Sequence, residues 1–457
     1  MIRVLLSVMA LAVVASAMAC ANEDPSIDES DEPSPTYIWP TKTPTVTVKS
    51  ISESTFSTGY TYGNISGNKY FAGTARLHEV DPLESTESSL RDQEWLLVAP
   101  HPLGGVVWFV VGEAGDIVGL RVESEGQITE PGNIYASRRD ELVPPMVIVG
   151  SISEENKNDL GAARIENLTT NGRNHLVKGV RFEEFGDNTV ISYKGLSTTY
   201  TLSTAPDAVP VIGNGAKLYS YSEPTDKYPH GALGDRTEWA SLSVISLTSE
   251  NREMRQLSLP KNEVFEGLYP LLVDLDNDGE DEVVTTVSEP DGGARLVVWS
   301  HTDEGIEIIA ESDPVGTGFR WLHQIAVAPF GPNGEIEIAV VETPHVGGIA
   351  KFYRLVGNRL ELVASEGGGY MSHVNGSRNL DQAVAGDFDG DGSVELLVPS
   401  RDQETLIALR RVGDSVEEVW KLELGSRLSS NLSVLETEDD KLILGAATED
   451  GVLHIWQ

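Results

Sequence analysis

The sequence predicts an all-β protein built from repeated units, and three observations support this prediction. From about residue 45 onward, short apolar or alternating runs such as WLLVAP, VVWFVV and IEIAVVE are separated by Gly, Asn, Asp and Ser turns. Hardly any segment of this region has the periodicity of an amphipathic helix. Two acidic loops of nearly the same spacing recur far apart, and a run typical of a β-strand follows each of them.

The acidic loops define the length of the repeat. Their first aspartates, Asp274 and Asp387, lie 113 residues apart, which is two steps of about 56 residues and within the range of known repeat units. A degenerate copy, VAPFGPNGEIEIAVVETP, stands midway between them. Roughly 400 residues at this period make about seven units, each long enough for the four short strands of one β-propeller blade. The prediction is therefore a seven-bladed β-propeller, with six or eight blades as alternatives.

Both ends of this region extend the series of repeats. LLVAPHPLGGVVWFV at 96–110 resembles VVETPHVGGIAKFY at 340–353, which places the N-terminal half in the same series. The last repeat stops at VLHIWQ, which matches the third strand of earlier units, so its outermost strand is missing. Because an unpaired edge would remain, we expect an N-terminal strand to close the ring, with residues 44–51 or 67–77 as the donor.

Residues 1–19 are typical of a signal peptide. Arg3 supplies a positive charge, and Val4–Ala17 form an apolar stretch that is too short to span a bilayer. Small residues then precede Cys20, the only cysteine, in a pattern that resembles a bacterial lipoprotein signal. The resemblance implies that Cys20 becomes the lipidated first residue; the alternative is ordinary cleavage that leaves a free thiol. In either case the mature chain is exported and has no internal disulfide.

The remaining chain divides into a tether and a folded domain. Residues 20–44 are rich in Pro, Ser, Asp and Glu and nearly devoid of aliphatic residues, so they cannot bury enough surface to offset the entropy of ordering. We expect this segment to be a disordered tether behind a lipid anchor. The predicted propeller then occupies residues 45–457.

The charge of the chain excludes one class of partner. It carries 33 basic and 71 acidic residues, a formal net charge of −38. Such a field repels phosphate backbones and anionic lipid surfaces, so we expect no nucleic-acid partner. The same field favours cations. We therefore expect contact with the membrane only through the lipid anchor.

The two acidic loops have the composition of calcium sites. Carboxylates at alternate positions repel one another unless a hard cation relieves them, and calcium takes about six to eight oxygen ligands. A glycine at the sixth position allows the sharp reversal of the loop. The predicted ligands of two structural Ca²⁺ sites are Asp274, Asp276, Asp278, the carbonyl of Glu280 and Glu282 in one loop, and Asp387, Asp389, Asp391, the carbonyl of Ser393 and Glu395 in the other. The alternative is a pair of solvated acidic loops that bind no metal.

An EF-hand begins with similar residues, but it needs a bidentate glutamate at position 12 and helices on both sides. Position 12 is Thr285 in one loop and Val398 in the other, and the flanking runs are typical of strands. The sequence therefore excludes the EF-hand and dockerin interpretations.

The strings DLDNDGEDEVV and DFDGDGSVELL resemble the FG-GAP (VCBS-type) repeats of integrin α-chain propellers and of many bacterial surface proteins. The resemblance implies calcium in loops between the first two strands of certain blades. The midway copy has Pro329 and Gly331 where the other loops have aspartates, so we expect it to bind no metal.

Four further residues are suited to ligand contact at a propeller face: His230, Asp235, His345 and His373. A catalytic role is disfavoured because no G-x-S-x-G, H-E-x-x-H, phosphate-binding glycine loop or cysteine nucleophile is present. We expect an exported, lipid-anchored, calcium-stabilised propeller that acts as a binding or scaffolding module for a protein or glycan at the bacterial cell envelope. The alternatives are a carbohydrate-active lyase or hydrolase, and a purely structural envelope component.

The lipoprotein hypothesis makes a direct prediction. Replacing Cys20 with serine removes the only thiol that can be lipidated, so C20S should block incorporation of labelled fatty acid and move the protein from the membrane fraction to the soluble one. Labelling of the variant at the parent's level would contradict the assignment.

Overall fold

The structure is a computed structural model, and the residues that it describes lie between residues 36 and 457. It describes residues 66–77, separate strands between residues 36 and 204, and residues 208–457 except 249–251, 277, 302–304 and 438. The chain divides into two units, residues 1–34 and 35–457, and the described residues lie in the second. The predicted signal peptide and Cys20 lie outside them, as do most residues of the predicted tether. Within the described part, no helix has the length and apolar character needed to cross a bilayer.

The described residues form β-strands and a single short 3-10 helix at Asn214–Ala216. Almost all neighbouring strands pair antiparallel, and most join strands that follow one another in the chain. The prediction of an all-β protein is therefore confirmed. Alternating and fully apolar runs give strands rather than helices because Gly and Asp turns interrupt them every few residues.

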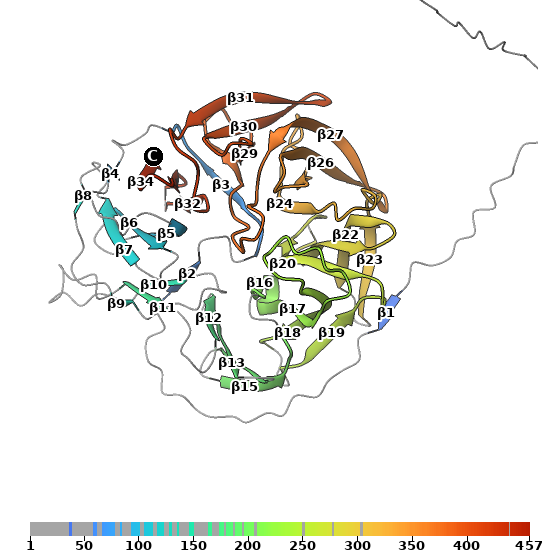
Figure 1. Ribbon diagram of the computed structural model, residues 1–457. Helices are drawn as coiled ribbons and strands as arrows, with labels where there is room; N and C mark the ends of the chain where they lie inside the picture. The colour runs from blue at the N-terminus through green and yellow to red at the C-terminus, as the bar shows by residue number, and fades with distance from the viewer. Residues whose placement is uncertain are drawn as a thin grey trace, which may run out of the picture. The chain divides into compact units, whose positions relative to one another are not determined.

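The largest sheet contains 13 strands, which are three consecutive groups of four and one added strand at the edge of the second group (Figure 1). Single residue pairs connect these groups: Trp239 with Phe265, and Glu311 with Arg359. The first group is β16 (Val211–Gly213), β17 (Lys217–Thr225), β18 (Glu238–Ser246) and β19 (Met254–Ser258). The second is β20 (Val264–Val273), β21 (Glu282–Glu289), β22 (Gly293–His301) and β23 (Gly305–Glu311), with β1 (Thr36–Ile38) paired to β23. The third is β24 (Leu322–Ala328), β25 (Glu337–Glu342), β26 (Gly348–Val356) and β27 (Arg359–Tyr370).

Five smaller sheets contain the other described strands. One is β5 (Gln93–Pro100), β6 (Val106–Gly112), β7 (Ile117–Val122) and β8 (Ile128–Thr129). Another is β2 (Thr58–Thr61), β10 (Met146–Val149), β11 (Ala163–Glu166) and β9 (Tyr135–Ala136). A third is β12 (Arg173–Val177), β13 (Val180–Phe185), β14 (Asn188–Tyr193) and β15 (Leu196–Thr201). The fourth is β3 (Tyr70–Thr74), β28 (Val384–Asp387), β29 (Glu395–Pro399), β30 (Thr405–Val412) and β31 (Ser415–Glu423). The fifth is β32 (Ser433–Glu436), β33 (Leu442–Ala447), β34 (Val452–Trp456) and β4 (Leu83–Glu84).

The hydrophobic cores lie between successive groups of strands. One cluster joins β13–β15 to β16–β19, another joins β17 and β18 to β20–β22, and a third joins β20–β23 to β24–β27. The series continues from β24–β26 to β28–β31 and from β28–β30 to β32–β34. A further cluster, which includes Trp108 and Ile455, joins β33 and β34 to β5–β7. The groups from β16–β19 to β32–β34 therefore each share a core with the group before and the group after.

The N-terminal segment completes the last sheet, as the missing outer strand predicted. Strand β4 pairs with β34, and Leu83 lies opposite Leu453. The donor differs from both segments that the sequence suggested. Residues 67–77 contain β3, which pairs parallel with β28 instead, and residues 44–51 lie outside the described residues.

Residues 66–77 are held by groups far away in the chain, which explains why they do not serve as the outer strand. The Asn68 side chain bonds both backbone groups of Val327, with Nδ2 3.0 Å from the carbonyl oxygen and Oδ1 2.9 Å from the amide nitrogen. The Leu272 amide donates to the Ser66 carbonyl at 2.9 Å, and the Thr74 amide donates to the Asp440 carbonyl at 2.9 Å. One short segment thus contacts the groups of β20, β24, β28 and β33.

Asn68→Ala tests how much this segment contributes to the free energy of unfolding. The Asn68 side chain is 8% exposed, and its loss leaves the Val327 amide and carbonyl buried without partners, at a cost of about 1–3 kcal/mol each. We expect the free energy of unfolding in urea to fall by about 2–4 kcal/mol. Asn375→Ala, at an exposed turn, is the control and should change stability by less than about 0.5 kcal/mol. If the two substitutions lowered the free energy of unfolding equally, the proposed contribution of Asn68 would be contradicted.

Candidate functional site

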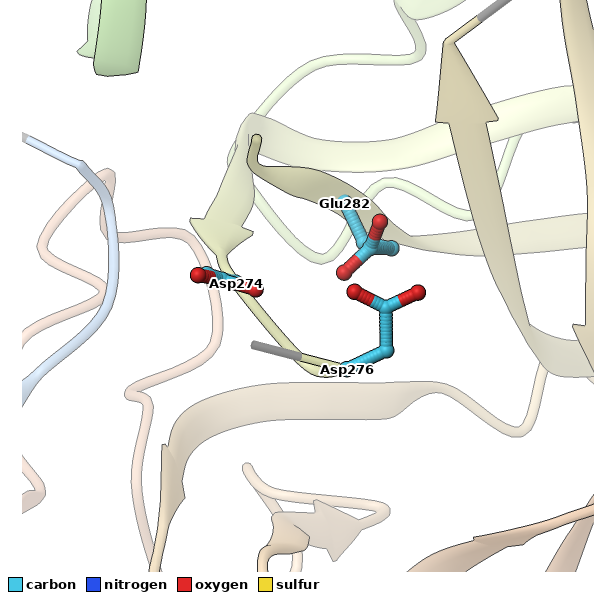
Figure 2. A group of neighbouring side chains, drawn as sticks. All are labelled: Asp274, Asp276 and Glu282. Atoms are coloured by element: carbon cyan, nitrogen blue, oxygen red, sulfur yellow. The ribbon is translucent and has the colours of Figure 1, made fainter. Parts of the chain in front are cut away.

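The first acidic loop connects β20 to β21. Asp274 follows the end of β20, and Glu282 is the first residue of β21. Asp274, Asp276 and Glu282 each place a carboxylate oxygen within 4.8 Å of the others. Figure 2 shows the carboxylates of Asp276 and Glu282 turned toward one another, with Asp274 across the loop. The structure therefore brings together three of the predicted ligands.

Backbone amides shape this loop around its first aspartate. The amides of Asp278 and Gly279 donate to the two carboxylate oxygens of Asp274 at 3.1 and 3.0 Å. Gly279 has a φ of 92°, a conformation that side chains other than glycine rarely adopt. Asp278 lies outside the group of three, and its carboxylate accepts a bond from the amide of Glu280 at 2.8 Å. The Glu280 side chain pairs with Lys217 at 2.5 Å.

Glu282 is the buried member of the group. It is 1% exposed, and one of its oxygens accepts a bond from the Leu275 amide at 2.8 Å. Burial, together with repulsion from Asp276, Asp278 and Asp274, raises the pKa of Glu282 to about 7. A cation bound between the carboxylates would relieve this strain because it stabilises their charged forms.

The second acidic loop, between β28 and β29, repeats this arrangement. Asp387, Asp389 and Glu395 each place an oxygen within 4.8 Å of the others. The amides of Gly390 and Gly392 donate to the two oxygens of Asp387 at 2.8 and 3.1 Å. The Phe388 amide donates to Glu395 at 3.0 Å, as the Leu275 amide does to Glu282.

Further polar contacts complete this second loop. Asp391 lies outside the group of three, and its carboxylate accepts a bond from the Ser393 amide at 2.9 Å. The Thr74 hydroxyl of β3 donates to Asp387 at 2.9 Å.

A guanidinium distinguishes the second loop from the first. Nη2 of Arg410 in β30 lies 2.5 Å from both Asp389 and Glu395, its Nη1 lies 2.7 Å from Asp391, and its Nε lies 2.9 Å from Glu395. Burial raises the pKa of Glu395 to about 7, although its hydrogen bond with Arg410 acts in the opposite direction. Sequence reasoning missed Arg410 because it stands 15 residues beyond Glu395, on the next strand.

The midway loop, between β24 and β25, contains arginine contacts and no aspartates. Its terminal glutamate, Glu337, is 0% exposed. Arg354 Nη2 lies 2.5 Å from one oxygen of Glu337, and Arg411 Nε lies 3.0 Å from the other. Protein cations therefore neutralise this buried carboxylate.

The first loop fits a calcium ion by its donor set. Three carboxylates, one of them buried, converge there, and among the described residues no ion pair joins them to a lysine or arginine. Carboxylate oxygens are the ligands that calcium prefers. The second loop has the same donors, but a metal ion would have to displace Arg410. Both groups could hold metal ions.

A second cluster gathers histidines from separate loops. His230 lies 5.5 Å from His345 between ring centroids, and His345 lies 5.9 Å from His373. The Trp321 ring lies 4.9 Å from that of His323 in a tilted contact and 5.3 Å from that of His373 in an edge-on contact, between ring centroids. The structure thus brings together three of the four residues predicted for ligand contact.

Asp235, the fourth, pairs with Arg378 at 2.6 Å. Sequence reasoning missed Trp321 and His323 because no local pattern links them to the other loops.

Two histidines of this cluster, His323 and His373, are buried, and burial lowers the pKa of each. His373 Nε2 faces the Ser377 carbonyl at 2.7 Å and must carry the hydrogen, so its Nδ1 holds a lone pair. Nδ1 of His373, Nε2 of His323 and Nδ1 of His345 are buried without a hydrogen-bond partner among the described residues. A cavity of about 10 Å³ lined in part by Glu266, Trp321 and His323 has room for about one water molecule.

Comparison with known proteins finds a similarity only among solved structures. No protein-family model matches the chain, and neither does any curated protein. Among solved structures, the chain is similar to Kluyveromyces lactis Hsv2 with a complete loop 6CD, at 12% sequence identity and a TM-score of 0.38. The similarity covers 70% of this chain and 95% of that one.

Burial of the histidines predicts acid sensitivity. Burial is the main cause that lowers the pKa of His373 from 6.5 to about 3, and His345, His230 and Lys69 add to it. Above pH 6.5 His373 is neutral in both the folded and the unfolded chain, so its low pKa does not lower the free energy of unfolding. As the pH falls from there toward 3, the unfolded chain takes up a proton that the folded one refuses, so stability is lost, by about 2 kcal/mol at pH 5. His373→Gln should therefore lose about 2 kcal/mol less between pH 7 and pH 5 than the parent does in urea unfolding.

Ile325→Val is the control, because it changes the core without removing a titrating group. It should lower stability equally at both pH values. The same pH dependence in H373Q and in the parent would contradict the prediction.

Proposed function

We propose that the protein is an exported, lipid-anchored, calcium-stabilised β-propeller that acts as a binding or scaffolding module at the bacterial cell envelope. One observation carries this proposal. Two groups of three carboxylates occupy the same place in two repeat units, between the first and second strands of β20–β23 and of β28–β31. This placement agrees with the resemblance of the loops to FG-GAP repeats.

The order of packing supports the propeller. Each four-stranded group contributes to the core of the next, from β12–β15 through β32–β34, and β33 and β34 share a core with β5–β7. Strand β10 contacts both β5 and β12, which connects the two remaining neighbours. Such a closed order of sheets is the arrangement of propeller blades. Eight four-stranded groups favour the alternative of eight blades over the predicted seven.

Calcium in these loops would be structural. In the first loop Asp274, Asp276 and Glu282 would hold it, with Asp278 and the carbonyl of Glu280 as further donors. The ion supplies positive charge to a crowded set of carboxylates and ties the end of β20 to the start of β21. The strong acidic excess of the chain, a net charge of −38, favours cation binding for the same electrostatic reason.

The binding role is favoured over the enzymatic alternative by the histidine cluster itself. Its imidazole rings contact one another at tilted or edge-on angles, and His373 contacts Trp321 edge-on. The cavity of about 10 Å³ beside His323 is too small for a sugar ring. We therefore propose a protein or glycan ligand that binds at a surface, with His230, Asp235, His345 and His373 near the contact.

Calcium should stabilise the folded protein. A ligand that binds only the native state adds about 2.7 kcal/mol when its concentration is 100 times its Kd. We expect the Tm to rise on addition of calcium and to return on addition of EDTA. The double variant Asp276→Ala/Asp389→Ala should lose this response.

Asp291→Asn, an exposed aspartate outside both loops, should retain it. A calcium response that persists in the double variant would exclude these loops as the sites.

A further inference from the structure

We propose that Arg410 is a built-in counter-cation for the loop at residues 387–395, so that the two calcium loops are not equivalent. The loop at 274–282 binds calcium tightly, whereas calcium binds at 387–395 only by displacing the guanidinium. The inference rests on the proposed function, because it concerns how calcium is divided between the two loops.

The guanidinium of Arg410 contacts carboxylates that a calcium ion in this loop would also bind. Its Nη2 lies 2.5 Å from Asp389, its Nη1 lies 2.7 Å from Asp391, and its Nε lies 2.9 Å from Glu395. A guanidinium presents several donors in one plane and can therefore bind more than one carboxylate at once. The Glu395 side chain is 0% exposed and that of Arg410 is 17% exposed, so solvent screens this group less than it screens a surface ion pair.

Three repeat units differ in the residue that stands at the place of Arg410. Glu395 pairs across the sheet with Arg410. In the midway unit, Arg354 stands one residue beyond the pair of Ile338 and Tyr353, in the same place relative to its loop.

In the first unit this place belongs to Ser300, one residue beyond the pair of Val283 and Trp299. The first unit thus has aspartates and a serine, the midway unit has an arginine and no aspartates, and the unit of Arg410 has both.

The midway unit shows that an arginine at this place can satisfy the buried glutamate without metal. Arg354 holds Glu337 at 2.5 Å, with help from Arg411. Glu337 keeps its place at the start of β25, as Glu282 does at the start of β21. A guanidinium and a calcium ion are therefore alternative solutions to one problem, a buried carboxylate at the start of the second strand.

The first loop has no such competitor among the described residues. Lys217 pairs with the exposed side chain of Glu280 at 2.5 Å, and Glu280 was predicted to offer its carbonyl rather than its side chain. Calcium at Asp274, Asp276 and Glu282 therefore displaces no protein cation. At the other loop the ion must break three charge-assisted contacts before it binds, and affinity falls accordingly.

Calcium titration of the full chain by isothermal calorimetry tests the inference. We expect the parent to bind calcium in one tight class and one class at least tenfold weaker. Asp276→Asn should remove the tight class, and Asp389→Asn should remove the weak one. Arg410→Ser, which installs the residue found at the matched place in the first unit, should tighten the weak class at least tenfold.

The reciprocal variant Ser300→Arg should weaken the tight class by a similar factor. Ser300 takes part in no ion pair among the described residues, so this variant keeps the inference testable if circular dichroism shows that Arg410→Ser fails to fold. Two classes of equal affinity in the parent would overturn the inference, as would unchanged calcium binding in both Arg410→Ser and Ser300→Arg. Either result would leave the proposed calcium sites intact, whereas a complete lack of calcium binding in the parent and in Arg410→Ser would overturn the proposed function itself.

Discussion

Several strands of this protein are buried on both faces, and the need to cover both faces governs the rest of the structure. All residues of β6, β24, β25 and β33 are buried, although successive side chains of a strand point to opposite sides. A sheet of this kind must lie between two others. The clusters that join each group of strands to the next meet this need. Both acidic groups lie in loops, each with its glutamate at the start of the following strand.

Strict burial creates an electrostatic problem at one recurring place. Glu282, Glu337 and Glu395 each begin the second strand of a group, and each is at most 1% exposed. A carboxylate at such a position needs a partner, because an isolated buried charge is costly. Arginines provide the partner for Glu337 and Glu395. Glu282 has a backbone amide and two aspartates nearby instead. Because no arginine balances its charge there, a metal ion would stabilise this loop more than the other two.

Polar side chains also join the groups of strands where apolar contact cannot. Asn68 bonds the backbone of Val327, and Asn431 bonds both backbone groups of Leu96 at 2.8 Å. Lys69 is buried beside Asp381 at 3.2 Å. Paired in this way, the buried polar groups fix the alignment of neighbouring sheets, since any shift would leave them without partners.

The sequence by itself determined the features that depend on local spacing. Alternating runs and turn residues determined the all-β class, and the recurrence of Asp274 at Asp387 located both acidic groups, because their ligands lie within nine residues of one another. The tertiary structure decided what depends on distant contacts. It decided that Arg410 faces one acidic group and Ser300 stands at the matched place of the other, that β4 completes the last sheet, and that His230, His345 and His373 meet. Such contacts arise from the register and packing of strands far apart in the chain, which no short motif in the sequence encodes.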